Sequence, residues 1–544
     1  MSTNSMYFSR YRPAKPITDD LRRHCHILLD EGLYTNALSL LTDVLIVGAS
    51  HPHSQEMPAF APIPFHVELV STLLVHPRYT NQADTDEHGE LASQCIFLLR
   101  NILGILGPIN FKFTEAFSYA PIATGDKLTS GPCRVATGPG ETSAQSDFED
   151  TINHVRGDIG NKGRIRLCAR DFWHMVGWSG NCSAKYPFRW RYLKVWLEYM
   201  VDVLVADWKE RQRLELESSN LCEVEINERN QTLLQQSLIV SYLPGARVSR
   251  ATAIRRIVQS LFTDGSSSSL RDFPPVFPNE TKELKFHTLA KLMKSDAISS
   301  SRDIEEELYE PEGEELALSC EKIDDTEDGV TVTESSIEGN EIMTLRQRLF
   351  TLLVSVANFL PTHLTTPPEL INLLCDAIQP TPLPQFTTFI GSCTASFLTE
   401  SIQLSLCQAL LCRLLPRSTL RPGPNASDII SQQTLETCYL PFTAVTSSPI
   451  ENTKVSLLLE NLLRRLIISH RAYATPSLKE ALETGIMARQ SLASRLGKRA
   501  RLSQVGDEIR RLNASGIRLQ SQLALLKKKP LTTVEMVTDS NEVA

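Results

Sequence analysis

The chain has 544 residues, of which 42% are apolar and 22% are charged, with 25 glycines and 30 prolines. At about 150 residues per domain, this length predicts two to four domains and is ample for large buried cores. The composition excludes a disulfide-stapled miniprotein, a fibrous protein and a wholly disordered chain. We therefore expect a mostly globular protein.

Charge is distributed unevenly along the chain. The formal net charge is −8, but the tract from Asp303 to Glu341 contains sixteen acidic residues and one basic residue, Lys322. Residues 464–529, by contrast, hold fifteen Lys and Arg against four acidic residues. Because the acidic tract has too few large apolar side chains to offset chain entropy, we expect it to form a disordered linker. Basic charge is concentrated near the C-terminal end.

Cysteine usage and hydropathy restrict the compartment. The twelve cysteines are scattered singly and form no CxxC pair, which is typical of a reducing compartment. The apolar run from Leu349 to Leu360 spans only twelve residues and contains Ser355 and Asn358, whereas a membrane-spanning helix needs about 20 residues. The first residues also lack the apolar stretch of a secretory signal. We expect no membrane partner.

Apolar residues recur mainly at spacings of three and four, which predicts helices, and the alternation typical of strands is rare. Caps, prolines and glycines delimit these periodic segments as helix ends should. We expect the helices at residues 18–29, 35–47, 64–74, 89–106, 229–243, 249–262, 344–359, 368–378, 394–415, 426–440 and 451–470.

Short loops join several of these helices into antiparallel pairs, but no repeat of fixed period is present. The predicted fold class is therefore all-α, with irregular helical-repeat blocks of the HEAT-like α-solenoid kind. The predicted organisation is a disordered N-terminus (1–17), an N-terminal helical domain (18–263) with a flexible insertion (121–166), a Ser/Pro-rich and then acidic disordered linker (264–341), a second helical block (342–471), a basic amphipathic or coiled-coil region (472–529) and a disordered tail (530–544).

All five tryptophans lie between Trp173 and Trp208. A long helix beginning near Arg189 places Trp190 and Trp208 on one apolar stripe at helical spacing, so we interpret the cluster as the core of the N-terminal domain. Interleaved cations leave an alternative open, because exposed aromatic residues beside arginines can stack nucleic-acid bases. The helical stripe favours the core.

Catalytic signatures are incomplete. The sequence from Gly177 to Asn181 resembles a nucleophile elbow, but Asn181 replaces the second glycine and no strand precedes it. Residues 157–163 lack the spacing of a phosphate-binding loop, and no HExxH pattern occurs. We predict no catalytic residue and no cofactor.

Two groups of histidine and cysteine invite a metal interpretation. In His24-Cys25-His26 the two histidines are two positions apart on a helix and so point in different directions. Cys168, His174 and Cys182 would need a fourth ligand from a distant part of the chain. We therefore expect ordinary core or surface side chains and predict no metal site.

Basic residues near the C-terminus fit a short nuclear-import pattern. Lys498, Arg499 and Arg501 form an extended basic segment of the kind that import receptors read, and they could also contact a polyanion. We predict location in the nucleus, with the cytoplasm as the alternative.

A heptad pattern follows that basic segment. Its apolar positions alternate spacings of three and four, which is typical of a helix that pairs with another helix. We predict that this helix binds a partner helix, and the alternative is that it docks on the chain's own helical block. The predicted pairing residues are Leu502, Val505, Ile509, Leu512, Leu519, Leu523 and Leu526.

These patterns together favour a non-enzymatic nuclear scaffold or adaptor subunit of a multiprotein, chromatin-associated complex. Its partners would be other protein subunits, held on helical surfaces and by the C-terminal heptads. Two alternatives stay open. One is nucleic-acid binding through the basic C-terminal region, starting from non-specific backbone contact. The other is an enzyme whose site is assembled from distant residues.

Overall fold

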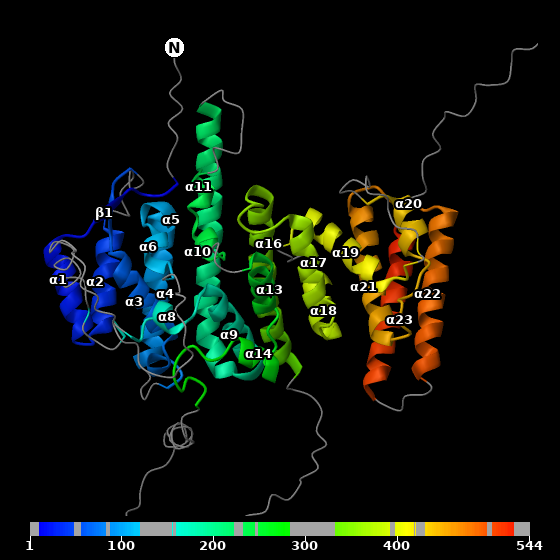
Figure 1. Ribbon diagram of the computed structural model, residues 1–544, viewed down its shortest axis with the longest axis horizontal. Helices are drawn as coiled ribbons and strands as arrows, with labels where there is room; N and C mark the ends of the chain where they lie inside the picture. The colour runs from blue at the N-terminus through cyan, green and yellow to red at the C-terminus, as the bar shows by residue number, and fades with distance from the viewer. Residues whose placement is uncertain are drawn as a thin grey trace, which may run out of the picture. The chain divides into compact units, whose positions relative to one another are not determined.

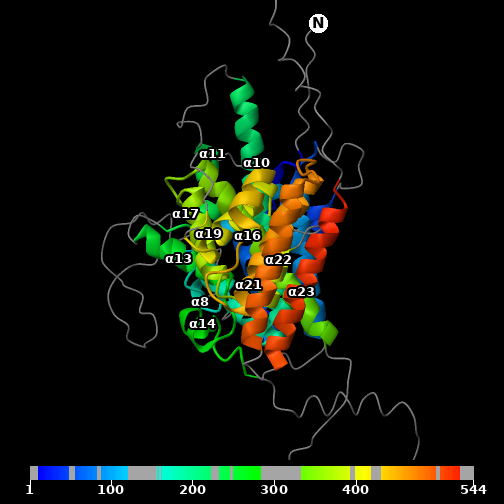
Figure 2. The same cartoon turned by 90° about the vertical axis from the view of Figure 1, so that its right-hand side faces the viewer.

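The computed structural model describes residues 10–47, 56–82, 87–119, 155, 159–160, 162–221, 232–244, 249–282, 332–391, 398–417, 419, 430–497 and 503–526. These residues are mostly helical (Figures 1 and 2), which confirms the predicted dominance of helix. A small two-stranded sheet, which the apolar pattern did not predict, accompanies the helices.

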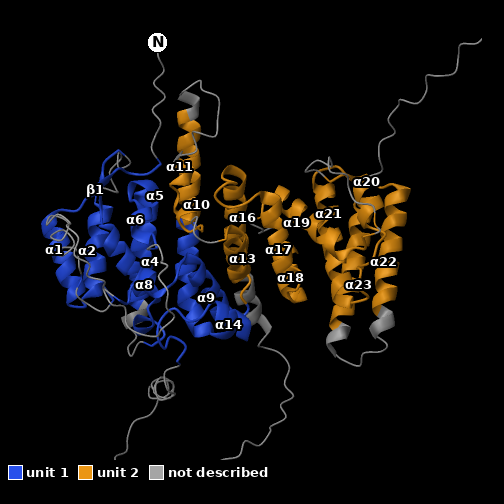
Figure 3. Cartoon of the chain, in the orientation of Figure 1, with its two compact units in different colours: residues 1–203, 264–339 blue, residues 204–263, 340–544 orange. Residues whose placement is uncertain are grey.

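The chain divides into two compact units (Figure 3). Unit 1 comprises residues 1–203 and 264–339, and unit 2 comprises residues 204–263 and 340–544. One division falls inside a long helix rather than in a loop. This division does not show which segments fold independently. The domain boundaries predicted from the sequence therefore stay a prediction.

Unit 1 begins with a short parallel sheet in which β1 (Ala14–Pro16) pairs with β2 (Ala59–Ala61). Its helices confirm the four predicted near the N-terminus. They are α1 (Asp19–Asp30), α2 (Tyr34–Ile46), α3 (Pro64–Val75), η1 (Pro77–Tyr79), α4 (Glu87–Ile105), α5 (Gly107–Asn110), α6 (Phe113–Phe117), α8 (Ile165–Cys168), α9 (Phe172–Lys185), the first half of α10 (Pro187–Leu221) and α14 (Ser267–Asp272).

Helix α3 is the centre of the unit 1 core. Every residue from His66 to Val75 is buried, and the helix packs against α4, α6 and α8. Pro64 occupies its first turn, where a missing N–H costs nothing. Trp196 of α10 donates its indole N–H to Ser71 at 2.9 Å, which satisfies both polar groups inside the core.

Residues 264–282 belong to unit 1 rather than forming part of a flexible connection. Their composition predicts a Ser/Pro-rich linker, but Phe273, Phe277 and Glu280 are buried. Asn181 of α9 fixes this segment, because its amide donates to the carbonyl of Phe273 at 3.0 Å. Tertiary contacts therefore supply the order that the local composition does not indicate.

Unit 2 contains the second half of α10 and the remaining helices. They are α11 (Thr232–Gln235), α12 (Leu238–Ser241), α13 (Arg250–Leu261), most of α16 (Val332–Phe359), α17 (Pro367–Ile378), α18 (Leu383–Gly391), α19 (Glu400–Leu414), α20 (Gln432–Thr434), the π-helix η3 (Leu435–Tyr439), α21 (Pro449–Ile468), α22 (Pro476–Gly497) and α23 (Ser503–Ala524). Helix α16 begins inside the predicted acidic linker, and residues 303–331 lie outside the described residues.

Helix α21 is the central helix of unit 2. Its residues from Asn452 to Leu466 are buried almost throughout, and it packs against α18, α19, α22 and α23. Helices α21, α22 and α23 lie side by side in both views (Figures 1 and 2). They form a three-helix group, called the C-terminal bundle below.

One predicted helix is interrupted. Instead of a continuous helix over residues 229–243, the structure contains the short helices α11 and α12. Asp207 of α10 accepts the backbone N–H of Leu238 at 2.7 Å, and Glu215 accepts those of Leu233 and Leu234. Carboxylates of α10 thus satisfy N–H groups that a continuous helix would bond internally. The prediction of one continuous helix was wrong, because the carboxylates that accept these N–H groups belong to another helix and so do not enter the local pattern of residues 229–243.

Candidate functional site

An open groove of about 700 Å³ lies between α17 and α19 in unit 2. Helix α17 contributes polar side chains, α19 contributes its last turn, and Val445 from a later loop completes the wall. The residues that line the groove are Asn372, Gln379, Ala409, Cys412, Arg413, Leu415, Pro416, Arg417 and Val445.

Local structure explains why these residues converge. Helix α19 ends at Leu414, and Pro416 cannot continue it. The backbone N–H of Val445 donates to the carbonyl of Leu414 at 2.8 Å, which holds the loop beside the helix end. The side chain of Val445 is nevertheless 62% exposed, so it presents an apolar surface to solvent.

Two buried or half-buried cations fix the α17 wall. Arg413 of α19 forms an ion pair with Asp376 and donates to the carbonyl of Asn372 at 2.9 Å. Lys454 of α21 donates to the carbonyls of Gln379 and Thr381 at 2.6 and 2.7 Å, at the C-terminal end of α17. Burial lowers the pKa of the Lys454 ammonium. The groove therefore has a rigid wall.

The electrostatic character of the groove is positive. Among the described residues, its lining contains two arginines and no aspartate or glutamate. Arg413 is already committed to Asp376, whereas Arg417 is exposed and has no acidic partner among the described residues. The described lining of the groove thus combines an apolar wall with one available guanidinium group.

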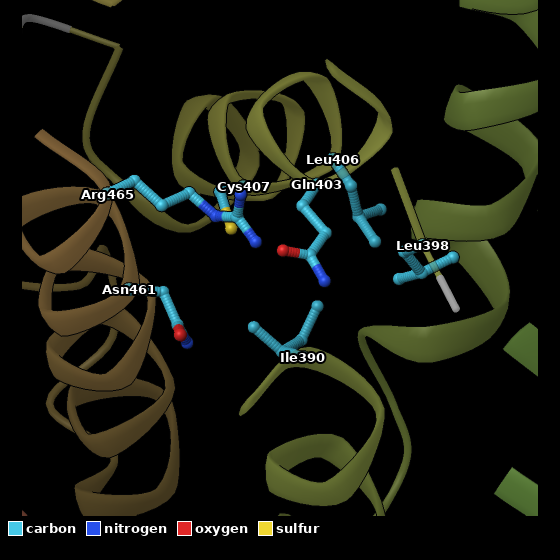
Figure 4. A pocket seen from close by; sticks show the side chains of 7 residues that line it. All are labelled: Ile390, Leu398, Gln403, Leu406, Cys407, Asn461 and Arg465. Carbon is cyan, nitrogen blue, oxygen red and sulfur yellow. The ribbon is translucent and has the colours of Figure 1, made fainter. Parts of the chain in front are cut away.

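A second cavity in unit 2 lies where α19 faces α21 (Figure 4). Gln403 reaches into it from α19, and Asn461 and Arg465 border it from α21. The lining also includes Ile390, Leu398, Leu406 and Cys407. These side chains leave no room for a water molecule, so this cavity is a packing feature of the helical core.

A third cavity, in unit 1, brings titratable groups together. Glu68 is buried and contacts Arg166 at 2.7 Å and Arg164 at 3.4 Å. Burial raises the pKa of the Glu68 carboxyl, and the two arginines oppose that shift. Burial also raises the pKa of Tyr119. Such perturbed groups are typical of active sites, but the cavity holds only about 10 Å³, room for one water molecule.

The predicted pairing residues are divided by the structure. Leu512 and Leu519 are 2% and 0% exposed and lie in the C-terminal bundle, where α23 packs on α21 and α22. Ile509, Leu523 and Leu526 are half-buried. Leu502 and the side chain of Val505 lie outside the described residues, as do Lys498, Arg499 and Arg501.

A polar seam in the bundle was missed by the sequence analysis. Ser515 of α23 lies 2.9 Å from Ser456 of α21, oxygen to oxygen, and donates to Glu460 at 3.1 Å. Arg518 and Arg464 also donate to the Glu460 carboxylate, at 2.8 and 2.9 Å. The glycine at position 516 within the apolar heptad stripe marks a different contact, where α23 approaches Ile486 and Gln490 of α22 closely.

The tryptophan cluster is core. The five side chains, at positions 173, 178, 190, 196 and 208, are at most 2% exposed. This confirms that the cluster is packed and contradicts the alternative of an exposed platform for nucleic-acid bases. Four of the tryptophans belong to unit 1, whereas Trp208 belongs to unit 2. The nucleophile-elbow resemblance also fails, because Ser179 is buried within α9 and Gly177 packs against Phe273.

The histidines of the metal hypotheses have other environments. His174 accepts the backbone N–H of Arg170 through Nδ1, and its Nε2 lies 2.9 Å from the carbonyl of Pro274. Among the described residues, no group of three or more His, Cys, Asp and Glu is arranged to hold a metal ion. In the same part of the chain, no helix combines the length and apolar character needed to cross a membrane.

The chain was compared with known proteins by sequence. No protein-family model matches it, and no curated protein matches it significantly.

Proposed function

We propose that the protein is a non-enzymatic scaffold or adaptor subunit of a nuclear multiprotein complex, associated with chromatin. In this proposal its helical blocks are irregular relatives of helical-repeat proteins and hold partner segments on their surfaces. The observation that carries the proposal is the groove between α17 and α19. It is open, has a rigid wall and offers apolar surface next to a cation, which suits a polypeptide segment.

The C-terminal bundle supplies a second surface. Leu512 and Leu519 already pack inside the chain, so a partner helix could reach them only by opening the bundle. The half-buried Ile509, Leu523 and Leu526 remain accessible, and Ile517 of the same helix is 63% exposed. We therefore propose that a partner helix contacts the outer face of α23.

Affinity purification of the tagged full chain after nuclease treatment, followed by mass spectrometry, tests the proposal. We expect stoichiometric protein partners. The variants Val445→Glu and Ile517→Glu change exposed positions in the groove and on α23, and each should release a subset of partners. Leu33→Glu, at an apolar residue that is 48% exposed in unit 1, is the control. Recovery of the protein alone would overturn the scaffold proposal.

Nuclear location has its own test. Changing Lys498, Arg499 and Arg501 to Ala should move a tagged protein toward the cytoplasm, because these changes remove the basic segment that the import receptor would bind. Changing Arg510 and Arg511, which are exposed on α23, to Ala controls for general loss of basic charge. An unchanged nuclear signal in the first variant would refute the assignment.

Nucleic-acid binding is the second candidate, and the exposed Arg510 and Arg511 of α23 favour it. The full chain is the right material, because α23 packs on α21. Binding to a labelled DNA duplex should weaken steeply with salt if basic residues contact phosphates. The Arg510→Ala/Arg511→Ala variant should then bind more weakly and with a shallower salt dependence. An affinity that does not change with salt would exclude this candidate.

A further inference from the structure

We propose that the groove between α17 and α19 binds a short peptide segment that carries an aspartate or glutamate next to a large apolar residue. The apolar side chain covers Val445 and the half-buried Pro416, and the carboxylate pairs with the guanidinium of Arg417. This inference rests on the scaffold function and names the chemistry of the partner.

Charge complementarity identifies the acidic residue of the partner. The part of the groove lining that the structure describes contains arginines but no carboxylate. Arg413 has Asp376 as its ion-pair partner and also donates to Asn372, so its charge is compensated within the chain. Arg417 has no such partner among the described residues. A carboxylate at the rim therefore meets an uncompensated cation, which favours acidic over basic segments.

The apolar wall of the groove indicates that the partner segment carries a large apolar side chain, and it argues against a polyanion as the ligand. Val445 is held in place by its backbone bond to Leu414 while its side chain is 62% exposed. Covering such a side chain removes apolar area from water, which a phosphate backbone cannot do. Recognition of phosphates would also be expected to use several available cations, whereas the described residues of the lining offer one, Arg417.

The wall is set before a ligand arrives. Arg413 joins α19 to α17, and Lys454 joins α21 to the end of α17 through carbonyls of Gln379 and Thr381. A ligand therefore does not have to order the wall on binding, which reduces the entropic cost of association. This suits recognition of a short segment with few contacts.

Peptide selection on the full-length protein tests the inference. The probe is a library of random peptides displayed on phage, and the enriched peptides are then labelled and titrated by fluorescence anisotropy. We expect enrichment of Asp or Glu beside Leu, Ile or Phe. Arg417→Glu and Val445→Glu should each weaken binding by about tenfold or more.

Matched variants separate the groove from general effects. Arg510→Glu reverses an exposed arginine on α23, and Val47→Glu changes a valine that is 57% exposed in unit 1. Both should leave peptide binding within about twofold of the original protein. Because all four positions are exposed, the thermal unfolding curves should coincide, and a variant that fails to fold is replaced by Arg417→Gln or Val445→Ser.

Several outcomes would overturn the inference. The first is enrichment of basic or compositionally unbiased peptides, and the second is binding that neither groove variant weakens. The third is displacement of the bound peptides by heparin and by no other competitor. The fourth is that no peptide is selected, because the chain's own residues fill the groove.

Failure of the scaffold proposal has a different signature. If partners co-purify and remain bound to both groove variants, the scaffold function stands and the peptide site falls. If the expected peptides are selected but no protein co-purifies, the peptide site stands and the scaffold function falls.

Discussion

Arg189 of α10 and Glu280, which lies 91 positions later in the chain, form an ion pair inside unit 1. Their Nε and Oε2 atoms are 2.6 Å apart, and both side chains are at most 1% exposed. The second oxygen of Glu280 accepts the backbone N–H groups of Val276 and Phe277, and Arg189 also donates to Thr80. This single pair therefore ties residues 276–280 and the end of η1 to α10.

Because the Arg189–Glu280 ion pair is buried, we expect its loss to lower the free energy of unfolding much more than the loss of an exposed ion pair. Glu280→Gln leaves the charge of Arg189 buried without a counter-ion, so we expect the free energy of unfolding to fall by about 3 kcal/mol. Asp507→Asn is the control, because the ion pair of Asp507 with Arg510 is largely exposed, and its loss should cost less than about 1 kcal/mol. Chemical denaturation followed by tryptophan fluorescence and circular dichroism measures both changes. Equal losses would contradict the structural role of the pair.

A glycine in α22 should be intolerant of any side chain. A Cβ atom at Gly485 would lie 1.9 Å from the carbonyl oxygen of Leu440, which belongs to the backbone and cannot move aside alone. We expect Gly485→Ala to destabilise the protein by about 2 kcal/mol. Gly104→Ala in α4 makes the same substitution where nothing lies within 4 Å, and it should stabilise the protein by up to about 1 kcal/mol. Thermal denaturation of both variants should give shifts of opposite sign.

Two neighbouring residues of α23 distinguish internal docking from partner binding. Leu519 is fully buried in the C-terminal bundle and Ile517 is 63% exposed. Leu519→Ala should lower the free energy of unfolding by about 2–5 kcal/mol. Ile517→Ala should change it by no more than about 0.5 kcal/mol, and its effect should be seen in partner recovery. If Leu519→Ala were as stable as the original protein, the internal docking of α23 would be incorrect.

A buried histidine pair predicts loss of stability in mild acid. His66 of α3 and His26 of α1 have ring centroids 4.8 Å apart, and neither ring nitrogen of His66 has a hydrogen-bond partner among the described residues. Burial, with His26 and Arg22 nearby, lowers the pKa of His66 to about 3. Burial and Arg22 also lower the pKa of His26, while Asp30 opposes that shift.

The sign of the pH effect follows from proton binding. Below its ordinary pKa of 6.5, His66 gains a proton in the unfolded chain but not in the folded chain, so stability is lost as pH falls from 6.5 toward 3. Between pH 7.5 and 5 the loss from His66 is about 2 kcal/mol. His66→Phe should remove it, whereas His24→Gln, at an exposed histidine of the same helix as His26, should not. Urea denaturation at both pH values makes the comparison, and parallel losses in all three proteins would refute it.

Helix class and most helix positions were predictable from the sequence because both depend on local features. Apolar spacing and Pro at helix starts act within a few residues, and helices such as α1, α3 and α13 lie within one or two residues of their predicted ends. Part of the tryptophan core was predictable for the same reason, since a stripe on one helix marked Trp190 and Trp208, whereas Trp173 and Trp178 lie on α9.

Tertiary structure alone decided which surfaces meet. The heptad stripe of α23 predicts that something covers it, but the same stripe would be buried by a partner helix or by α21 and α22, so the pattern cannot distinguish the two. The interruption between α11 and α12 depends on Asp207 of another helix. The groove depends on Arg417, three residues after α19 ends, and Val445, in a later loop, lining the same groove. Such contacts join residues far apart in the chain, so the apolar periodicity of one segment does not show which other segment packs against it.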